Sequence, residues 1–193
     1  GFRTPPVTLE RRKDDDPDNR RLVAVRFPKW LQCPSCDVIK PERRWKNDPG
    51  HAYRYCPTCT EKAHGDSKVF VIPVRFVMAC KHGHVDEFPW DWWVGHKPEC
   101  RVAQRDNVDR HPGLMLQSES PGLAGLILSC PKCGARRSMD GVFSKKTWEH
   151  GPKCRGYRPW LADGDEVCGK EQNAVQRGAS NLYFAVTESA LSI

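Results

Sequence analysis

Residues 80–100 read CKHGHVDEFPWDWWVGHKPEC, and the rest of the chain can be arranged around them. Two ligand pairs, Cys80 with His84 and His96 with Cys100, flank an aromatic segment in this stretch. Four nitrogen and sulfur donors in two closely spaced pairs are typical of a closed, tetrahedral zinc site. We therefore expect a zinc ion at the middle of the chain. His82 competes with His84 for this position, and we favour His84 because its three-residue gap from Cys80 equals the gap between His96 and Cys100.

The composition indicates a small protein that needs disulfides or metal sites to stabilise its fold. The chain has 193 residues, a hydrophobic fraction of 38%, 15 glycines and 16 prolines, which leaves little material for a conventional core. Ten cysteines can supply the missing stability, either as disulfides or as metal ligands. Their arrangement in tight pairs favours metal. No apolar segment marks a secretion signal or a membrane span, so we expect a cytoplasmic protein without membrane contact.

The first pairs outside the central stretch form a zinc ribbon pattern. Cys33 and Cys36 are separated by two residues, and so are Cys56 and Cys59 further along the chain. Two such pairs with a loop between them are a specific sign of a zinc site, because each tight turn aims two sulfur atoms at one point.

The last four cysteines complete a third set. Cys130 and Cys133 form another close pair, whereas Cys154 and Cys168 are widely separated, so this signal is less specific. Ten cysteines with His84 give eleven donors, and His96 makes twelve, which is the number that three tetrahedral sites require. We therefore predict three structural zinc ions, while the spacing leaves a different pairing among the three sets open.

The fold class expected from these patterns is α+β: a small, loop-rich, zinc-binding module of ribbon and knuckle elements with short strands and two or three short helices. Residues 1–21 are polar and predict a flexible tail, residues 22–68 a zinc-ribbon module, and residues 69–193 a central and C-terminal zinc-binding module. The expected strands are residues 22–27, 69–79 with a break or an edge position at Pro73, 126–129 and 182–186. The expected helices are residues 90–95 and 138–148, the second with Ser138 as its N-cap.

Basic side chains give the chain a net charge of +7, which suits a polyanionic partner without proving one. The candidate nucleic-acid contacts are Arg43, Arg44, Lys46, Arg136, Arg137, Lys145 and Lys146. Aromatic residues alternate with the first of these, as in surfaces that hold phosphates and stack bases. The alternative is that the aromatic residues cover the small ribbon core while the charges stay in water. The tryptophans of residues 90–93 have the same two interpretations, and we favour packing around the zinc.

No pattern of a metal-dependent or nucleophilic enzyme is present. A catalytic zinc keeps an open fourth position, whereas each predicted set has four protein ligands. The zinc deaminase, HExxH, phosphate-loop and GxSxG patterns are all missing. Asp86, Glu87 and Asp91 leave a metal-dependent nuclease as a minor alternative. We expect no catalytic residues and no small-molecule substrate. A ubiquitin-ligase type of cross-braced module is disfavoured, because the three predicted ligand sets follow one another along the chain instead of being interleaved.

Several longer stretches resemble the DrmB family of the bacterial DISARM anti-phage defence system. They are FPKWLQCPSC (residues 27–36), PVRFVMAC (73–80), GHVDEFPW (83–90), WVGH (93–96), CPKCGARRSM (130–139), CRGYRPWL (154–161) and RGASNLYF (177–184). Together they are distributed over most of residues 22–193.

This resemblance implies a non-catalytic subunit that works with a helicase subunit of the DrmA type. It also implies that the pair of proteins binds DNA, with a preference for ends that carry a single-stranded overhang. Family members are much longer, so the chain resembles their zinc-rich portion. A protein-interaction scaffold that never contacts DNA is the rival interpretation, with Trp92 and Trp93 as the docking residues.

Overall fold

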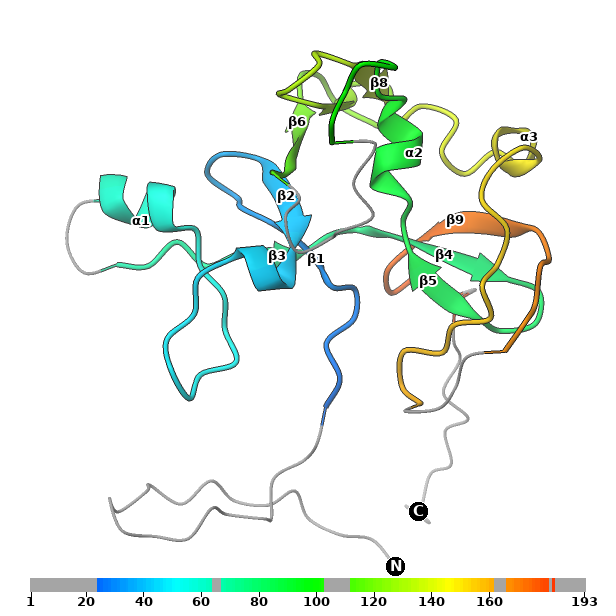
Figure 1. Cartoon of the computed structure of the whole chain (residues 1–193), viewed down its shortest axis with the longest axis horizontal. Coiled ribbons are helices and arrows are strands. Elements are labelled where there is room, and N and C mark those ends of the chain that lie inside the picture. The colour runs from blue at the N-terminus through cyan, green and yellow to red at the C-terminus, as the bar shows by residue number, and fades with distance from the viewer. Residues whose placement is uncertain (1–23, 64–66, 103–111, 162–165, 181, 183–193) are drawn as a thin grey trace, which may run out of the picture.

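The computed structural model describes residues 24–63, 67–102, 112–161, 166–180 and 182. Two antiparallel sheets and three short α-helices make up this part of the chain, which confirms the α+β class (Figure 1). The strands are β1 (Trp30–Gln32), β2 (Val38–Pro41), β3 (Ile72–Pro73), β4 (Phe76–Cys80), β5 (Val85–Glu87), β6 (Leu114–Ser118), β7 (Leu126–Ser129), β8 (Arg136–Ser138) and β9 (Gln172–Gln176). The helices are α1 (Pro57–Lys62), α2 (Trp90–Val94) and α3 (Lys145–Trp148), with a 3₁₀ turn, η1, at Glu42–Arg44. None of the helices within these described ranges is long and apolar enough to cross a membrane.

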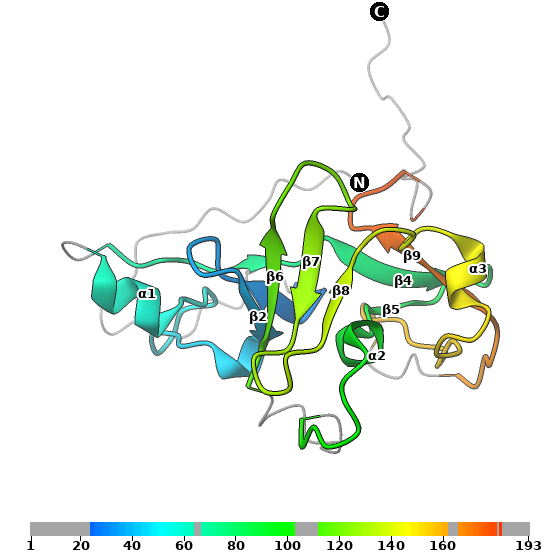
Figure 2. The same cartoon turned by 90° about the horizontal axis from the view of Figure 1, so that it is seen from above.

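The larger sheet has six strands in the order β3-β1-β2-β6-β7-β8, and the smaller one has the order β5-β4-β9. Figure 2 shows β6, β7 and β8 side by side. The large sheet combines β1 and β2 from the predicted ribbon region with four strands from the predicted second region. Pro73 lies in β3 at the edge of the large sheet, which is where a strand tolerates a residue without an amide hydrogen.

The core lies between the two sheets and below α2 and α3. Alternation along β1 explains why there are two apolar clusters: Trp30 faces the main core, while Leu31 faces a small cluster with Trp45 and Val71. The main cluster joins Phe76 of β4 to the tryptophans of α2 and α3 and to strands β2, β6 and β7. The small cluster surrounds the first four cysteines.

Several predicted elements occur where expected. The predicted strand at 126–129 is β7, and the predicted run at 69–79 divides at Pro73 into β3 and β4. Helix α2 follows Pro89 and ends at Gly95, whose left-handed conformation (φ 61°) is the common way to terminate a helix. The predicted strand at 182–186 and the tail at 1–21 lie outside the described residues.

Two predictions about the elements are wrong. Ser138 is not a helix N-cap but the last residue of β8, and only Lys145–Trp148 is helical. The reason is the pairing of β8 with β7, which satisfies its backbone in the sheet. The described part of residues 22–27 forms no strand.

Candidate metal centres

Twelve side chains gather in three groups of four, and within each group the donor atoms lie within 4.8 Å of one another. The groups contain the following residues: Cys33, Cys36, Cys56 and Cys59 in cluster 1; Cys80, His84, Cys154 and Cys168 in cluster 2; His96, Cys100, Cys130 and Cys133 in cluster 3. These are the twelve residues that the sequence singled out.

The pairing predicted for two of these groups is wrong. Cys80 and His84 do not share a site with His96 and Cys100; they meet Cys154 and Cys168 instead. The physical reason is the tertiary packing of two elements. Strand β9 pairs with β4, which brings Gln172 opposite Cys80 and carries the preceding segment with Cys168 to it.

Helix α2, which precedes His96 and Cys100, packs on β8 of the large sheet. The indole Nε1 of Trp93 donates a hydrogen bond to the carbonyl of Ser138 (3.2 Å), and Arg137 donates one to the carbonyl of Trp93 (3.2 Å). His96 follows this helix directly and therefore reaches the turn between β7 and β8. Cluster 3 is thus nested in sequence between the two halves of cluster 2, and the expected succession of the three sets is also wrong.

Each cluster takes one donor pair from the turn of a β-hairpin. Cys33 and Cys36 lie between β1 and β2, Cys80 and His84 between β4 and β5, and Cys130 and Cys133 between β7 and β8. The turns share a backbone pattern in which a later amide returns to the carbonyl of the first cysteine. The bonds are Asp37 N to Cys33 O (3.0 Å), Gly83 N to Cys80 O (3.1 Å) and Gly134 N to Cys130 O (2.9 Å).

The three residues whose amides donate these bonds adopt positive φ angles, namely 57° for Asp37, 79° for Gly83 and 70° for Gly134. Glycine adopts this conformation without strain, and aspartate tolerates it better than most residues. The turns therefore hold their two donors on the same side before the second pair arrives.

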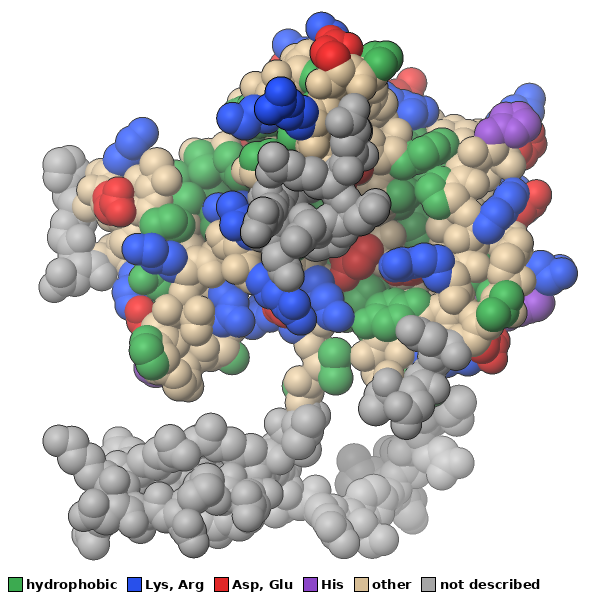
Figure 3. Space-filling model, in the orientation of Figure 1, with side chains coloured by type: hydrophobic (Ala, Val, Ile, Leu, Met, Phe, Trp, Pro, Cys, Tyr) green, Lys and Arg blue, Asp and Glu red, His purple; other side chains and the backbone are tan. Residues whose placement is uncertain are grey.

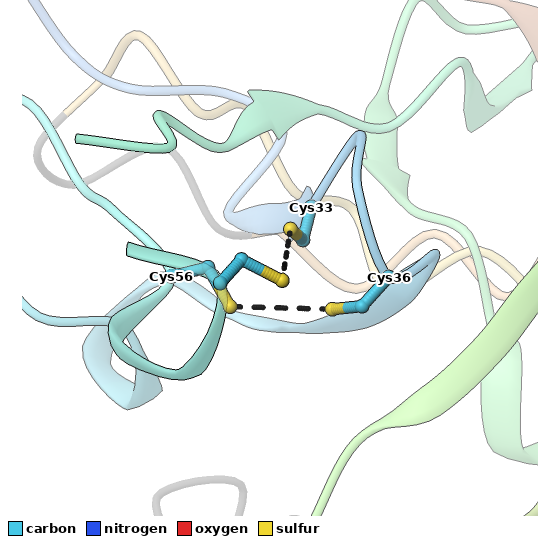
Figure 4. A group of neighbouring side chains, drawn as sticks. Cys33, Cys36 and Cys56 are labelled. Carbon is cyan, nitrogen blue, oxygen red and sulfur yellow. Dashed lines mark hydrogen bonds between the residues drawn. The ribbon is translucent and has the colours of Figure 1, made fainter. Parts of the chain in front are cut away.

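The geometry of cluster 1 fits a zinc ion. The Sγ atoms of Cys33 and Cys59 are 3.7 Å apart, and those of Cys36 and Cys56 are 4.0 Å apart. A tetrahedral ion bound at the usual zinc–sulfur distance holds its sulfur atoms about 3.8 Å apart. Figure 4 shows the sulfur atoms of the three labelled cysteines close together, with a dashed line joining those of Cys36 and Cys56.

Clusters 2 and 3 fit the same ion with one nitrogen donor each. His84 Nδ1 lies 3.3 Å from Cys80 Sγ, and His96 Nδ1 lies 3.5 Å from Cys100 Sγ and 3.6 Å from Cys133 Sγ. A tetrahedral zinc with one imidazole and one thiolate on an edge places these two atoms about 3.5 Å apart. The donor sets, soft sulfur with neutral imidazole, are those that zinc prefers.

A carboxylate orients each histidine from behind. His96 Nε2 forms a 2.9 Å hydrogen bond with Asp91 Oδ1, whereas His84 Nε2 lies 2.6 Å from Glu166 Oε1 in an ion-pair contact that lacks hydrogen-bond geometry. Such a carboxylate fixes the tautomer that leaves Nδ1 free to bind a metal. Neither residue was predicted in this function from the sequence. Asp91 gave a weak signal through its position in the short helix that directly precedes His96, whereas nothing along the chain connects Glu166 to His84.

The electrostatics of the thiols indicate groups of like charge that need a cation. Although burial alone would raise it, backbone N–H groups of His82 and His84 lower the pKa of Cys80 to about 7. Burial raises the pKa of Cys154, in the same cluster, to about 12. Neighbouring thiolates repel each other, so one thiol loses its proton easily and the next resists. A bound divalent ion removes this conflict by holding all the sulfur atoms as thiolates.

Cluster 3 shows the same contrast. Burial raises the pKa of Cys130 to about 11. In Cys133 the effect of burial is outweighed by hydrogen bonds from backbone amides and from His96, and the pKa is lowered to about 6.

The acidic residues considered for a nuclease have other partners. The guanidinium of Arg155 donates two hydrogen bonds, of 2.8 and 2.7 Å, to the carboxylate of Asp86. Asp91 forms a hydrogen bond with His96. Glu87 is half-buried, and its Oε1 accepts a 2.5 Å hydrogen bond from the amide of Lys29. These positions favour structural functions for the three carboxylates.

The candidate nucleic-acid residues lie on separate elements. Arg43 and Arg44 belong to η1, and Lys46 follows it; Arg136 and Arg137 belong to β8; Lys145 and Lys146 belong to α3. Figure 3 shows Lys and Arg side chains at several separate places on the visible face.

Two of these residues are used in packing or pairing. Arg137 lies 3.9 Å above the ring of Trp93, and burial lowers its pKa. Arg136 forms an ion pair with Glu119. Trp45, one of the aromatic residues between the first basic groups, is buried in the cluster 1 core, as the packing alternative expected.

The fold and the three clusters define a small α+β protein with three four-donor cysteine–histidine groups, each able to hold a metal ion. The chain belongs to the family described as a domain of unknown function, DUF8724, whose model matches residues 1–184. It is also similar to the DISARM protein DrmB of Bacillus paralicheniformis, with 31% identity over 140 residues. This match covers 72% of the chain and 22% of the relative, so the chain spans about a fifth of that protein's length. The resemblance to DrmB expected from the sequence is thereby confirmed.

Proposed function

We propose that this chain is a zinc-stabilised, non-catalytic part of a component of DISARM anti-phage defence. The observation that carries the proposal is that all ten cysteines, with His84 and His96, form three groups of four possible metal ligands. The chain that contains these groups is similar to DrmB. A site with four protein ligands has no open position for a reacting water, which favours a structural function. Each structural zinc adds on the order of 10 kcal/mol of folding free energy, which offsets a thin apolar core.

Metal analysis of the purified chain tests this proposal. We expect three zinc ions per chain, and two in a Cys59→Ala variant, because cluster 1 then has only three ligands. A wild-type protein that folds with two ions or fewer would refute the scheme. Dialysis against a chelator should unfold the protein, since the metal sites and the fold form together.

Support of a helicase subunit is the partner function that we infer. Trp92 on α2 is 37% exposed, whereas Trp93 is 0% exposed. Trp92 is therefore the tryptophan of this pair that a partner protein can reach, and Trp93 belongs to the core. The test is a pull-down of the helicase encoded with the full-length protein. Trp92→Ala should weaken capture without changing the zinc content, and Lys62→Ala, on the distant helix α1, should do neither.

Contact with DNA is the second part of this inference, and it depends on a basic hollow. Lys81, Lys145, Lys153 and Lys170 line a cavity of about 600 Å³ beside α3 and β9, together with Glu149 and Glu171. Only one of the predicted nucleic-acid residues, Lys145, contributes to it. The lysines come from four separate places in the sequence, so the fold creates this concentration of positive charge.

The salt dependence of DNA binding tests the hollow. Each lost phosphate contact should reduce the slope of log K against log salt concentration by about 0.7–0.9. We expect this reduction for Lys81→Ala and for Lys170→Ala on a duplex with an overhang. The control is Lys62→Ala, which removes the same charge from α1. Equal slopes in all of these variants would exclude the hollow as a DNA contact, and absence of binding at low salt would favour the scaffold function.

A further inference from the structure

His82 stands beside cluster 2 without being one of its four donors. It is exposed at the tip of the β4–β5 turn, and its Nδ1 lies 3.7 Å from Cys168 Sγ. This separation is close to the nitrogen–sulfur edge of about 3.5 Å in a tetrahedral zinc site. The backbone amide of His82 also donates a hydrogen bond to Cys80 Sγ (3.4 Å), so the residue is attached to the cluster at two points.

The four resident donors differ in how firmly they are held. Cys154 is buried and its Sγ accepts a 3.4 Å hydrogen bond from the amide of Gly156, and the ring of His84 is buried with Glu166 behind it. Cys168 is only half-buried, and its neighbour Val167 is fully exposed. Cys80 is half-buried as well, but it lies at the end of β4, and Cys168 is the half-buried donor next to which the ring of His82 lies.

We propose that His82 is a reserve ligand of cluster 2, which binds the metal in place of Cys168 when that thiolate is withdrawn or blocked. The exchange replaces one thiolate with one neutral imidazole, so the site changes from three sulfur donors and one nitrogen to two of each. Both sets are established for structural zinc. Cluster 2 would then keep its metal after damage to its exposed thiolate. This exchange rests on the proposed zinc binding.

Zinc content of four variants of the full chain tests the exchange. Cys168→Ala and His82→Ala should each keep as much zinc as the wild type, whereas the double variant should lose one ion per chain. Cys59→Ala in cluster 1 is the matched control and should lose one ion as a single change. Loss of one ion from Cys168→Ala alone, or retention of all zinc by the double variant, would overturn the proposal. Loss of zinc from His82→Ala would also overturn it, since His82 would then be a resident ligand.

Cobalt substitution identifies the new donor. In Cys168→Ala the thiolate-to-cobalt charge-transfer band of the one altered site should weaken by about a third, since two sulfur donors remain of three. The tetrahedral ligand-field bands should persist. Disappearance of those bands from the site would contradict the exchange.

A kinetic measurement covers the case in which Cys168→Ala fails to fold. Wild type and His82→Ala are treated with N-ethylmaleimide, and released zinc is followed with a chromophoric chelator. Release from one site should be several-fold faster in His82→Ala, because alkylation of Cys168 then leaves only three donors. Equal rates would overturn the proposal. A wild type that carries fewer than three zinc ions at the start would instead be a failure of the proposed function.

Discussion

At the scale of single residues, two carboxylates lie where they can orient the histidines of clusters 2 and 3. Asp91 and Glu166 each face the Nε2 atom of a histidine whose Nδ1 points into a cluster. Burial lowers the pKa of His96, but hydrogen bonds with Asp91 at Nε2 and with Cys133 at Nδ1 outweigh it, so the pKa is raised. Orientation of this kind increases the affinity of a ligand that is already present.

Replacement of Asp91 by alanine should weaken metal binding at cluster 3 by about 10–100-fold, because His96 loses its orienting partner. Competition with a chromophoric chelator measures the change. Glu61→Ala removes an exposed carboxylate from α1 and serves as the control. An affinity of Asp91→Ala equal to that of the wild type would show that His96 needs no partner.

Glu87 is the residue whose ionisation opposes folding. Burial raises its pKa from 4.5 to about 7, although the amide of Lys29 partly offsets the effect. A carboxyl group with a raised pKa in the folded state favours folding while it is protonated. This advantage is complete below the pKa of the unfolded chain and is lost as the pH rises through about 7.

Glu87→Gln should therefore become more stable relative to the wild type as the pH rises from about 5 to 8. The increment in unfolding free energy should approach roughly 3 kcal/mol, from about 1.4 kcal/mol per pKa unit. Urea unfolding of both proteins in a zinc-buffered solution gives the difference, and the pH dependence of the metal sites cancels between them. A difference that stays constant over this pH range would contradict the raised pKa.

At the scale of elements, α2 connects the aromatic core to cluster 3. Trp93 stacks on Trp148 with ring centroids 5.5 Å apart and lies under Arg137, while Trp92 covers the outer edge of the same group. The helix has only five residues, so its own hydrogen bonds cannot maintain it. Its stability comes from these contacts and from the metal ligands that follow it.

Trp93→Ala should cost about 3–5 kcal/mol of unfolding free energy, because it leaves a large cavity in a fully buried site. Trp92→Ala, at the exposed edge of the same helix, should cost much less and is the matched control. Denaturant unfolding at constant zinc concentration measures both. A similar loss for the two variants would mean that α2 is held mainly by cluster 3 and not by its core contacts.

Short-range features of these elements could be predicted from the sequence, and long-range ones could not. Pro89 and Gly95 mark the ends of α2, and Pro73 marks an edge position, because each acts on its own backbone. Strand β6 has no such marker: residues 114–118 follow a polar region and owe their extended form to pairing with β2 and β7. Ser138 was assigned to a helix for the same reason, since only the partner strand shows that it belongs to a sheet.

At the scale of the whole molecule, the twelve donors and the grouping of cluster 1 could be predicted, but the grouping of clusters 2 and 3 could not. Residue type and spacing identify a pair such as Cys130 and Cys133, because the turn that holds it is local. Which second pair completes the site depends on the pairing of β9 with β4 and on the packing of α2 against β8. Both contacts join distant parts of the chain, and spacing along the sequence contains no record of them.

The nested arrangement gives cluster 3 a particular mechanical function. His96 and Cys100 follow α2, which leads out of the small sheet, whereas Cys130 and Cys133 lie in the large sheet between β7 and β8. A metal at cluster 3 therefore ties the two sheets together. Cluster 1 ties α1 to the β1–β2 turn, and cluster 2 closes the small sheet at the end of β4. Loss of each ion should loosen a different part of the molecule.

The double variant Cys130→Ser/Cys133→Ser tests this division by hydrogen–deuterium exchange. Exchange should accelerate in α2 and β8, because their connection depends on cluster 3, while the five-residue pairing of β4 with β9 stays protected by cluster 2. The matched variant Cys33→Ser/Cys36→Ser should accelerate exchange in β1, β2 and α1 instead. Equal acceleration in every described segment of both variants would show that the metal sites unfold as one cooperative unit. In that case the ions would stabilise the whole fold together, and the nested order of the ligands would have no local mechanical consequence.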